Sequence, residues 1–145
     1  MKLSTKARYG IYAAVSLGKK YDEGFVNVSE IGADIAVSDG YLEHIFAMLK
    51  KAGIVEAQRG AYGGYRLSRD PSLITTGEIL RAVEDNLEIV DCLSGKCTQR
   101  GSCVAHTLWN NLYRKMNEYL DSVTLRQLID ENDNLTAEMH CRSDE

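Results

Sequence analysis

The chain has 145 residues, of which 44% are hydrophobic and 26% charged, a composition that favours a packed core and excludes wholesale disorder. At this length we expect one domain, or a small domain with an extension. No apolar run approaches the roughly 18 residues of a membrane span, and the start, MKLSTKARYG, lacks the apolar segment of a secretory signal. We therefore expect a cytoplasmic protein with no membrane partner, in which thiols stay reduced.

The charge is unevenly distributed along the chain. The formal net charge of −4 argues weakly against a nucleic-acid partner. Residues 1–70, however, carry ten Lys/Arg and eight Asp/Glu, whereas residues 71–145 carry seven and thirteen. Only the first half therefore has the sign of charge that suits DNA, and its excess is small.

The N-terminal half predicts a helix followed by a helix-turn-helix. Residues 4–21 place apolar side chains at a helical spacing behind Ser4, a residue type that caps helices. The next stretch, VNVSEIGADIAVSDGYLEHIFAMLKKAG, predicts a short helix over residues 28–36, a turn, and a second helix from Ser38 to about Ala52, ended by Gly53. The buried stripe of that second helix consists of Leu42, Ile45, Phe46 and Leu49.

The stretch IVEAQRGAYGGYRLSR, residues 54–69, predicts a β-hairpin. Two short alternating segments flank a turn that contains Gly60, Gly63 and Gly64. A hairpin directly after a helix-turn-helix is the wing of a winged helix, and Pro71 ends this unit. We therefore predict a mainly α-helical fold with a small β-hairpin wing.

The C-terminal half predicts a loop and a long helix. Thr75–Glu78 has the T-x-x-E form of a capping box, which opens a helix that runs to about Asp85. We divide the chain into a winged helix-turn-helix domain (1–85), a loop (86–103), a long helix with a short C-terminal helix ending near Asp130 (104–135), and a polar, flexible tail (136–145). The apolar stripe of the long helix consists of Leu108, Leu112, Met116, Tyr119 and Val123.

The outer face of the second helix and the wing supply candidate DNA contacts. A recognition helix carries short polar groups near its N-terminus, but such residues on any surface helix can simply be solvated. The helix pattern alone favours the solvated interpretation. The wing favours DNA, because Arg59 lies where its turn begins and can enter a minor groove. The candidates are Ser38, Tyr41, Glu43, His44 and Arg59, with Lys6, Arg8 and Lys51 as phosphate contacts.

The segment CLSGKCTQRGSCVAH gathers Cys92, Cys97, Cys103 and His106 at the start of the long helix. Thiolates are soft metal ligands, and imidazole suits iron and zinc. A glycine-rich loop can wrap a metal centre, and a helix N-terminus stabilises the nearby negative charge of a thiolate. We expect Cys141 and His140, which stand apart near the C-terminus, to be incidental.

Three interpretations of this segment compete. Structural zinc usually pairs its cysteines at closer spacings than these. A bare thiol sensor gives His106 no role. An iron–sulfur cluster accepts open spacing, and histidine can replace cysteine at a [2Fe–2S] centre. The residues alone favour the cluster slightly over zinc.

The chain resembles the IscR-like iron–sulfur cluster regulators of the Rrf2 family of bacterial winged-helix transcription regulators. The resemblance covers roughly residues 1–135 and is most specific in RGAYGGYRL and in the three cysteines with the histidine that lead into a Leu-Trp. It implies a homodimer whose long helices pack together, and one [2Fe–2S] cluster per subunit on Cys92, Cys97, Cys103 and His106. It also aligns Ser38, Tyr41 and Glu43 with recognition-helix contacts to operator DNA, and Arg59 with a wing arginine.

The chain departs from the pattern of these regulators at three places. The first cysteine gap is one residue shorter, and Asp39-Gly40 replaces an apolar-serine pair, so the operator sequence should not be carried over. Relatives that sense nitric oxide with a [4Fe–4S] cluster take an acidic ligand from the first helix, where this chain has Arg8, which cannot ligate. Relatives that regulate cysteine metabolism lack the cysteine loop.

We therefore expect a cluster-sensing transcription regulator that controls iron–sulfur assembly or related redox and iron genes. The alternatives are a zinc-stabilised winged-helix repressor and an iron–sulfur redox protein. The sequence shows no flavin, nicotinamide or phosphate-binding motif and no catalytic triad or carboxylate pair. We expect a protein that is not an enzyme.

Overall fold

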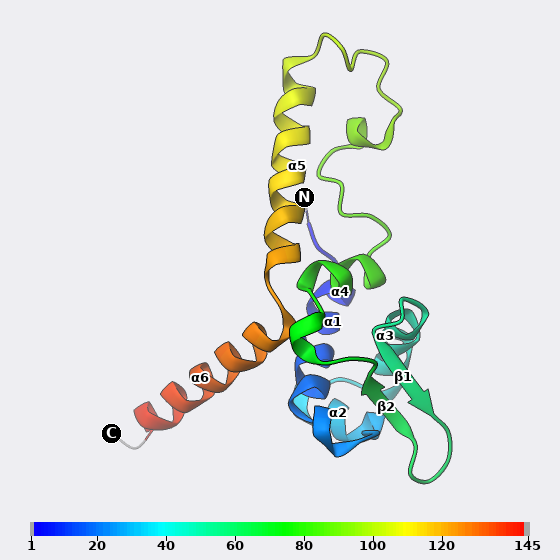
Figure 1. Cartoon of the computed structure of the whole chain (residues 1–145), viewed down its shortest axis with the longest axis vertical. Helices are drawn as coiled ribbons and strands as arrows, with labels where there is room; N and C mark the ends of the chain where they lie inside the picture. Colours follow the sequence, from blue (N-terminus) through cyan, green and yellow to red (C-terminus); the bar gives the residue numbers. More distant parts are fainter. Residues whose placement is uncertain (1, 144–145) are drawn as a thin grey trace.

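The computed structural model describes residues 2–143, with side chains described for residues 2–139. Within these residues, six α-helices and one two-stranded antiparallel sheet form a body from which two helices extend (Figure 1). Helix α5 (Val104–Ser122) and the loop before it rise along the long axis, and helix α6 (Leu125–Ser143) runs away from the body toward the C-terminus. No helix in the described part of the chain is long and apolar enough to cross a membrane.

The predicted helix-turn-helix is confirmed. Helix α1 (Thr5–Lys19) is capped by Ser4, helix α2 (Val28–Ile35) by Asn27, and helix α3 (Asp39–Lys51) by Ser38. Each cap side chain accepts a hydrogen bond from a backbone N–H of the first turn, which satisfies a donor that the helix cannot. The tight turn between α2 and α3 places Ala36 in the left-handed region, with φ of 55°.

The wing forms from strands β1 (Val55–Gln58) and β2 (Gly64–Leu67), which pair with Val55 opposite Leu67 and Gln58 opposite Gly64. Tyr65 also bridges to Val26, so the hairpin is hydrogen-bonded to the segment before α2. Gly64 has φ of +146°, and a Cβ there would lie 2.0 Å from the Val26 oxygen, so only glycine fits.

The hydrophobic core lies between α1, α2, α3, α4 (Thr76–Val83), the wing and the start of α6, which contributes Leu125 and Ile129. The predicted stripe of α3, which consists of Leu42, Ile45, Phe46 and Leu49, is fully buried. Phe46 stacks on Tyr65 of β2, with ring centroids 4.6 Å apart. This contact fixes the wing against α3.

Helix α4 (Thr76–Val83) begins with the predicted capping box, in which Thr75 and Glu78 satisfy each other's backbone N–H groups. A second, smaller cluster of Ala7, Leu80 and Leu87 lies on its far side, covered by side chains of helix α5 (Val104–Ser122). The short 3-10 helices are η1 (Tyr21–Glu23), η2 (Pro71–Leu73) and η3 (Asp91–Ser94), and the last of these packs against α5.

The apolar stripe expected on α5 is divided between two faces. Met116 packs with Tyr113 and Leu120 on the cluster around Leu80. The rest of the apolar surface is not covered by any residue that the structure describes. Val104, Leu108, Leu112 and Tyr119 are 87%, 58%, 50% and 67% exposed. Helix α5 therefore presents an uncovered apolar face along its length.

The C-terminal helix is longer than the sequence predicts. Helix α6 runs from Leu125 to Ser143, past the expected end near Asp130 and through most of the segment expected to be a flexible tail. Residues 131–143 contain neither glycine nor proline, so nothing in the sequence ends the helix. The side chains of His140 and Cys141 lie outside the described residues.

A polar network ties α1 to α2. Asp34 accepts hydrogen bonds from Lys20 at 2.7 Å and from the buried hydroxyl of Ser16 at 3.0 Å. The hydrogen bond from Lys20 is the main reason that the pKa of Asp34 lies below its ordinary value. The ionised carboxylate is therefore the form that the native state prefers.

We expect Asp34 to contribute acid sensitivity to the fold. Because its pKa is lower in the folded state, its stabilising effect is present above the ordinary pKa and is lost as the pH falls through the folded pKa. Asp34→Asn should lower the stability at pH 7 and flatten the fall in stability between pH 5 and pH 3, as measured by urea unfolding at each pH. A variant whose pH profile runs parallel to that of the wild type would contradict this.

Candidate DNA interface and metal centre

Helix α3 places the predicted recognition residues at the surface near its N-terminus. Ser38 is exposed and accepts a hydrogen bond from the Tyr41 N–H at 3.4 Å. Glu43 and His44 are exposed in the next turn, and Lys51 is exposed in the last. Asp39 accepts a hydrogen bond from the Ser29 hydroxyl at 2.6 Å, which holds α2 against the start of α3.

Tyr41 differs from these neighbours because it is half-buried. Its ring packs edge-on against Tyr9 of α1, with centroids 5.8 Å apart, and Tyr9 packs in the same way on Tyr12. The Tyr41 hydroxyl is buried without a hydrogen-bond partner among the described residues. Its expected role as a DNA contact therefore requires the side chain to turn outward.

Glu43 lies close to a phenol of the wing. Burial, and then the negative charge of Glu43, raise the pKa of Tyr65 above its ordinary value. The stack of Tyr65 on Phe46 therefore holds a neutral phenol beside the carboxylate of the recognition helix.

The two arginines of the wing are in different situations. Arg66 is engaged within the chain: it pairs with Glu56 at 2.9 Å and lies 4.4 Å from the centre of the Phe25 ring. Arg59, at the start of the turn, is exposed and makes no ion pair or hydrogen bond with any residue that the structure describes. Its guanidinium is available for an external anion.

The two candidate phosphate contacts of α1 lie on another element. Lys6 is half-buried, and Arg8 lies 5.2 Å from the centre of the Tyr9 ring. Arg8 also lines a shallow cleft next to Leu80 of α4 and Tyr119 of α5. Arg8 is thus adjacent to the uncovered face of α5.

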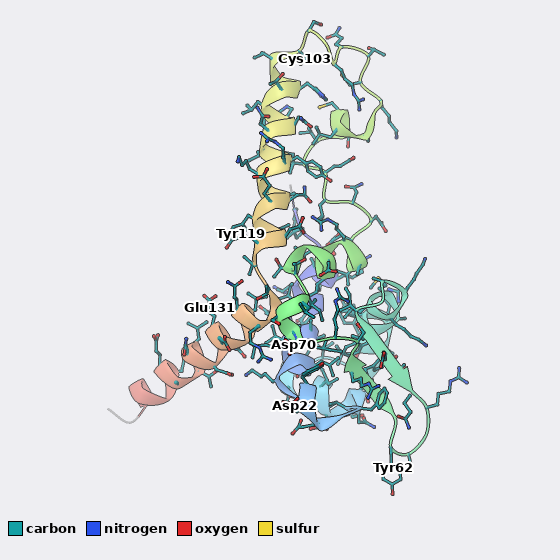
Figure 2. All side chains as sticks on the ribbon, viewed as in Figure 1. Asp22, Tyr62, Asp70, Cys103, Tyr119 and Glu131 are labelled. Carbon is teal, nitrogen blue, oxygen red and sulfur yellow. The ribbon has the colours of Figure 1, made fainter. Side chains whose placement is uncertain are left out.

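The cysteine loop lies at the far end of α5 from the body (Figure 2). Cys92 is in η3, Gly95 ends η3 with φ of +94°, and Cys103 is the N-cap residue of α5. No side chain caps the start of α5, so its first N–H groups remain available to stabilise negative charge.

The structure places the four candidate ligands on this loop and the first turn of α5. Cys92, Cys97 and Cys103 are half-buried free thiols. Among the described residues, no three His, Cys, Asp or Glu side chains are gathered closely enough to hold a metal ion. Nδ1 of His106, however, is buried without a hydrogen-bond partner in the described part.

This donor set fits a soft metal centre. A buried ring nitrogen that lacks a partner costs free energy, and ligation to a metal removes that cost. Three thiols that form no disulfide, next to a helix N-terminus, supply the remaining donors. The fit lies in the chemistry of the donors and not in their present arrangement.

Polar contacts join the C-terminal end of helix α5 to the body. The hydroxyl of Thr76 donates to the Leu120 carbonyl at 2.7 Å, and the largest group of contacts is a clamp around Arg81. Arg81 of α4 donates to the two carboxylate oxygens of Asp121, at 2.7 and 3.1 Å, and to the Asn117 side chain at 2.7 Å. A Cβ at Gly77 would lie 2.1 Å from the same carboxylate, so α4 and Asp121 are in close contact. The clamp fixes the C-terminal end of α5 on the winged helix.

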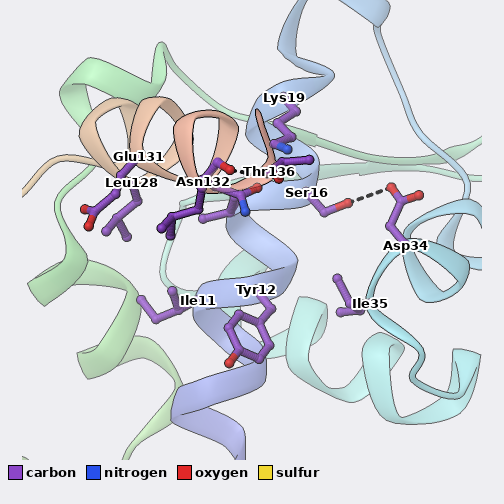
Figure 3. A pocket seen from close by; sticks show the side chains of 12 residues that line it. Ile11, Tyr12, Ser16, Lys19, Asp34, Ile35, Leu128, Glu131, Asn132 and Thr136 are labelled. Atoms are coloured by element: carbon purple, nitrogen blue, oxygen red, sulfur yellow. Dashed lines mark hydrogen bonds between the residues drawn. The ribbon is translucent and has the colours of Figure 1, made fainter. Parts of the chain in front are cut away.

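A wide cleft of about 680 Å³ separates α6 from α1 and α2 (Figure 3). Its walls include Ile11, Tyr12 and Ile35 on one side and Leu128 and Leu135 on the other. The apolar surface of the cleft, like that of α5, has no cover within the described residues.

A winged helix with a cysteine loop and a long C-terminal helix is the architecture of a known family of regulators. The model of the Rrf2 family, described as iron-dependent transcriptional regulators, matches residues 3–131. This chain belongs to the Rrf2 family. It is therefore a transcriptional regulator and not an enzyme.

Individual relatives of the chain are also transcriptional regulators. The chain is 38% identical over 135 residues to an HTH-type transcriptional regulator of Neisseria meningitidis, covering 92% of this chain and 91% of the relative. It is 35% identical over 134 residues to the HTH-type transcriptional regulator IscR of Aliivibrio salmonicida. That match covers 92% of this chain and 80% of the relative.

Solved structures confirm the fold. CymR, the global cysteine regulator of B. subtilis, is 36% identical, with a TM-score of 0.74 over 90% of this chain and 98% of its own. IscR of T. potens is 34% identical, with a TM-score of 0.73. The match covers 91% of this chain and 88% of the T. potens chain.

Sequence reasoning missed the contacts that join distant segments. No repeating pattern in the sequence indicates these contacts. They are the clamp of Arg81 with Asp121, the ring contact of Tyr9 with Tyr41, and the position of Tyr65 beside Glu43. The one available hint was the presence of tyrosines on α1 and in the wing among small and polar residues.

Proposed function

We propose that this Rrf2-family regulator binds operator DNA as a cytoplasmic homodimer and senses a [2Fe–2S] cluster, one per subunit. The cluster is held by Cys92, Cys97, Cys103 and His106. The observation that carries the proposal is the buried Nδ1 of His106, which lacks a hydrogen-bond partner among the described residues, on the helix that follows a loop with three free thiols. Its relatives include IscR, and the cytoplasm is where the chromosome lies in the bacteria of those relatives.

The uncovered face of α5 supports the homodimer. Four large apolar side chains, Val104, Leu108, Leu112 and Tyr119, are exposed on this helix. A patch of this kind on a folded protein marks an interaction surface. A second copy supplies the same stripe, so two α5 helices cover each other about a two-fold axis.

The positions of the ligands support sensing. The thiols lie at one end of α5, and the Arg81–Asp121 clamp holds the other end on the winged helix. When bound, the cluster supplies a labile centre that iron limitation or oxidants can empty. His106 is neutral and can be protonated when it leaves the metal, so its bond is weaker than that of a thiolate.

The dimer determines the distance between the two α3 helices, which are the proposed recognition helices. Because α5 joins the loop to the winged helix, the order of the loop can bias the spacing of the two α3 helices. Half-sites lie about one helical turn, roughly 34–36 Å, apart, so a small change in spacing alters the choice of operator. Genes of iron–sulfur assembly or of related iron and redox metabolism are the proposed targets.

Metal analysis tests the cluster directly. We expect protein purified without oxygen to be brown and to contain iron and sulfide in equal amounts, with an absorption spectrum of a [2Fe–2S] centre. One zinc per chain would replace this proposal with a zinc-stabilised repressor. Protein with neither metal after anaerobic expression in iron-rich medium would contradict both.

We expect Arg59 and Glu43 to contribute differently to DNA binding. Arg59→Ala should weaken binding to DNA from upstream of the gene for this protein by about tenfold or more, within the 1–3 kcal/mol typical of a groove contact. Glu43→Ala should instead relax the sequence preference, because a carboxylate accepts from cytosine but repels phosphate. Fluorescence anisotropy with operator and scrambled duplexes measures both effects.

Arg66→Ala provides the matched control in the same hairpin, because Arg66 is already paired with Glu56. Its affinity should stay within about twofold of the wild type if Arg59 acts through DNA and not through general charge. Equal losses at Arg59 and Arg66 would remove the groove assignment.

A further inference from the structure

One large side chain at the end of the wing is almost fully exposed. Tyr62 is 92% exposed, the most exposed large hydrophobic residue on the described surface. Figure 2 shows it at the tip of the hairpin, pointing away from the body, at the opposite end of the long axis from Cys103. An aromatic ring buries a large apolar area when it gains a partner, so an exposed ring at the end of the wing is suited to contact another molecule.

The backbone around Tyr62 leaves little freedom. A Cβ at Gly63 would lie 2.2 Å from the Gln58 oxygen, and one at Gly64 would lie 2.0 Å from the Val26 oxygen. Gly60 has φ of +107°. The turn is therefore tightly folded on both sides, with Tyr62 projecting from it.

The charge of the turn suits nucleic acid. Arg59 is the only charged residue between Gln58 and Gly64, and it is unpaired in the described structure. The nearest acid of the wing, Glu56, is neutralised by Arg66 at 2.9 Å. The tip thus combines one free cation with one exposed ring.

The wing is also held at a fixed place beside the recognition helix. Tyr65 of β2 stacks on Phe46 of α3 and bridges to Val26. Strands of four residues extend about 13 Å. In B-DNA the adjacent minor groove lies about half a helical turn, roughly 17 Å, from the major groove that holds a recognition helix.

We propose that the ring of Tyr62 enters the minor groove beside Arg59 and makes the protein reject a G·C pair beneath the wing. The inference rests on the proposed binding of operator DNA. The minor groove is about 6 Å wide and offers only acceptors over A·T pairs, while a G·C pair adds the guanine amino group to its floor. The ring occupies the space that this amino group would take, and the hydroxyl donates to the acceptors of A·T pairs.

Base substitution in the DNA tests the assignment. A duplex is first selected from random DNA by the wild-type protein, and its A·T pairs are then replaced one at a time by G·C or by inosine·C. Inosine lacks the amino group, so inosine·C keeps the minor-groove pattern of A·T with the major-groove pattern of G·C. At the pairs beneath the wing, we expect the wild type to lose about tenfold with G·C and less than twofold with inosine·C.

Two variants connect that preference to Tyr62. Tyr62→Ala should bind the selected duplex about tenfold more weakly and should distinguish A·T from G·C by no more than about twofold. Tyr62→Phe, which keeps the ring, should retain most of the discrimination. Leu73→Ala, which truncates another exposed apolar side chain outside the wing, should behave as the wild type.

The outcomes separate this inference from the function on which it rests. If Tyr62→Ala matches the wild type in affinity and discrimination while Arg59→Ala is weakened, the role of Tyr62 is wrong and DNA binding stands. If inosine·C is as harmful as G·C, the contact lies in the major groove and the inference fails. If the wild type enriches no DNA, both the inference and the proposed function fail.

Discussion

Replacing Phe46 with alanine is expected to lower the free energy of unfolding by about 3–5 kcal/mol, because the change deletes a fully buried ring and leaves a cavity. Phe46 is fully buried and stacks on Tyr65 of the wing. A loss of this size is a large part of the total of roughly 5–15 kcal/mol that stabilises a typical domain. Urea unfolding followed by circular dichroism measures it.

The same change is expected to impair DNA reading beyond its effect on stability. The stack helps to hold β2 on α3, together with the buried Leu67, so a loosened wing should reduce the contribution of Arg59. Phe46→Leu is the control, because it keeps most of the buried volume without the ring and should cost less than about 2 kcal/mol. An operator affinity that is unchanged in folded Phe46→Ala protein would show that the wing needs no anchor on α3.

The parts of the fold that the sequence predicts correctly are those with local causes. Ser4 and the pair Thr75–Glu78 cap helices as predicted, because a cap acts within three residues of itself. The glycines of the wing predict a turn because positive φ angles, which glycine adopts readily, are needed at the turn itself. The stripe of α3 is buried as predicted, because its helical spacing leaves it only one apolar face.

The parts that the sequence does not predict depend on distant partners. Nothing near Tyr41 shows that its ring packs on Tyr9, so its hydroxyl was expected at the surface and is buried instead. The clamp of Arg81 with Asp121 joins residues 40 positions apart. Helix α6 extends past the predicted end near Asp130, because residues 131–143 are polar but contain no glycine or proline to end a helix.

For the candidate metal centre, the sequence likewise predicts the residues but not their arrangement in space. Spacing and residue type suggest the ligands, because donor chemistry is a property of the side chain. Their arrangement depends on the conformation of a long loop, which spacing does not predict, and within the described residues the three thiols and His106 are not gathered. Metal binding that orders a loop of this kind couples occupancy to the position of α5.

Replacing Cys103 with alanine is therefore expected to abolish the cluster. Anaerobic wild-type protein should carry about two iron and two sulfide per chain, and Cys103→Ala close to none. Cys103 is the proposed ligand at the start of α5, where uncapped N–H groups favour nearby negative charge. Its loss thus removes both a donor and the link between the loop and α5. Iron and sulfide assays and visible absorption measure the result.

The remaining cysteine provides the matched control. Cys141→Ala removes one thiol far along the sequence from the loop, and we expect its iron content and operator preference to match those of the wild type. Cys103→Ala should bind operators as cluster-free wild-type protein does, because both lack the group that orders the loop. If the two cysteine variants lose iron equally, the ligand set is wrong. If cluster-loaded and cluster-free wild-type protein bind the same duplexes with equal affinity, the cluster is held but not sensed.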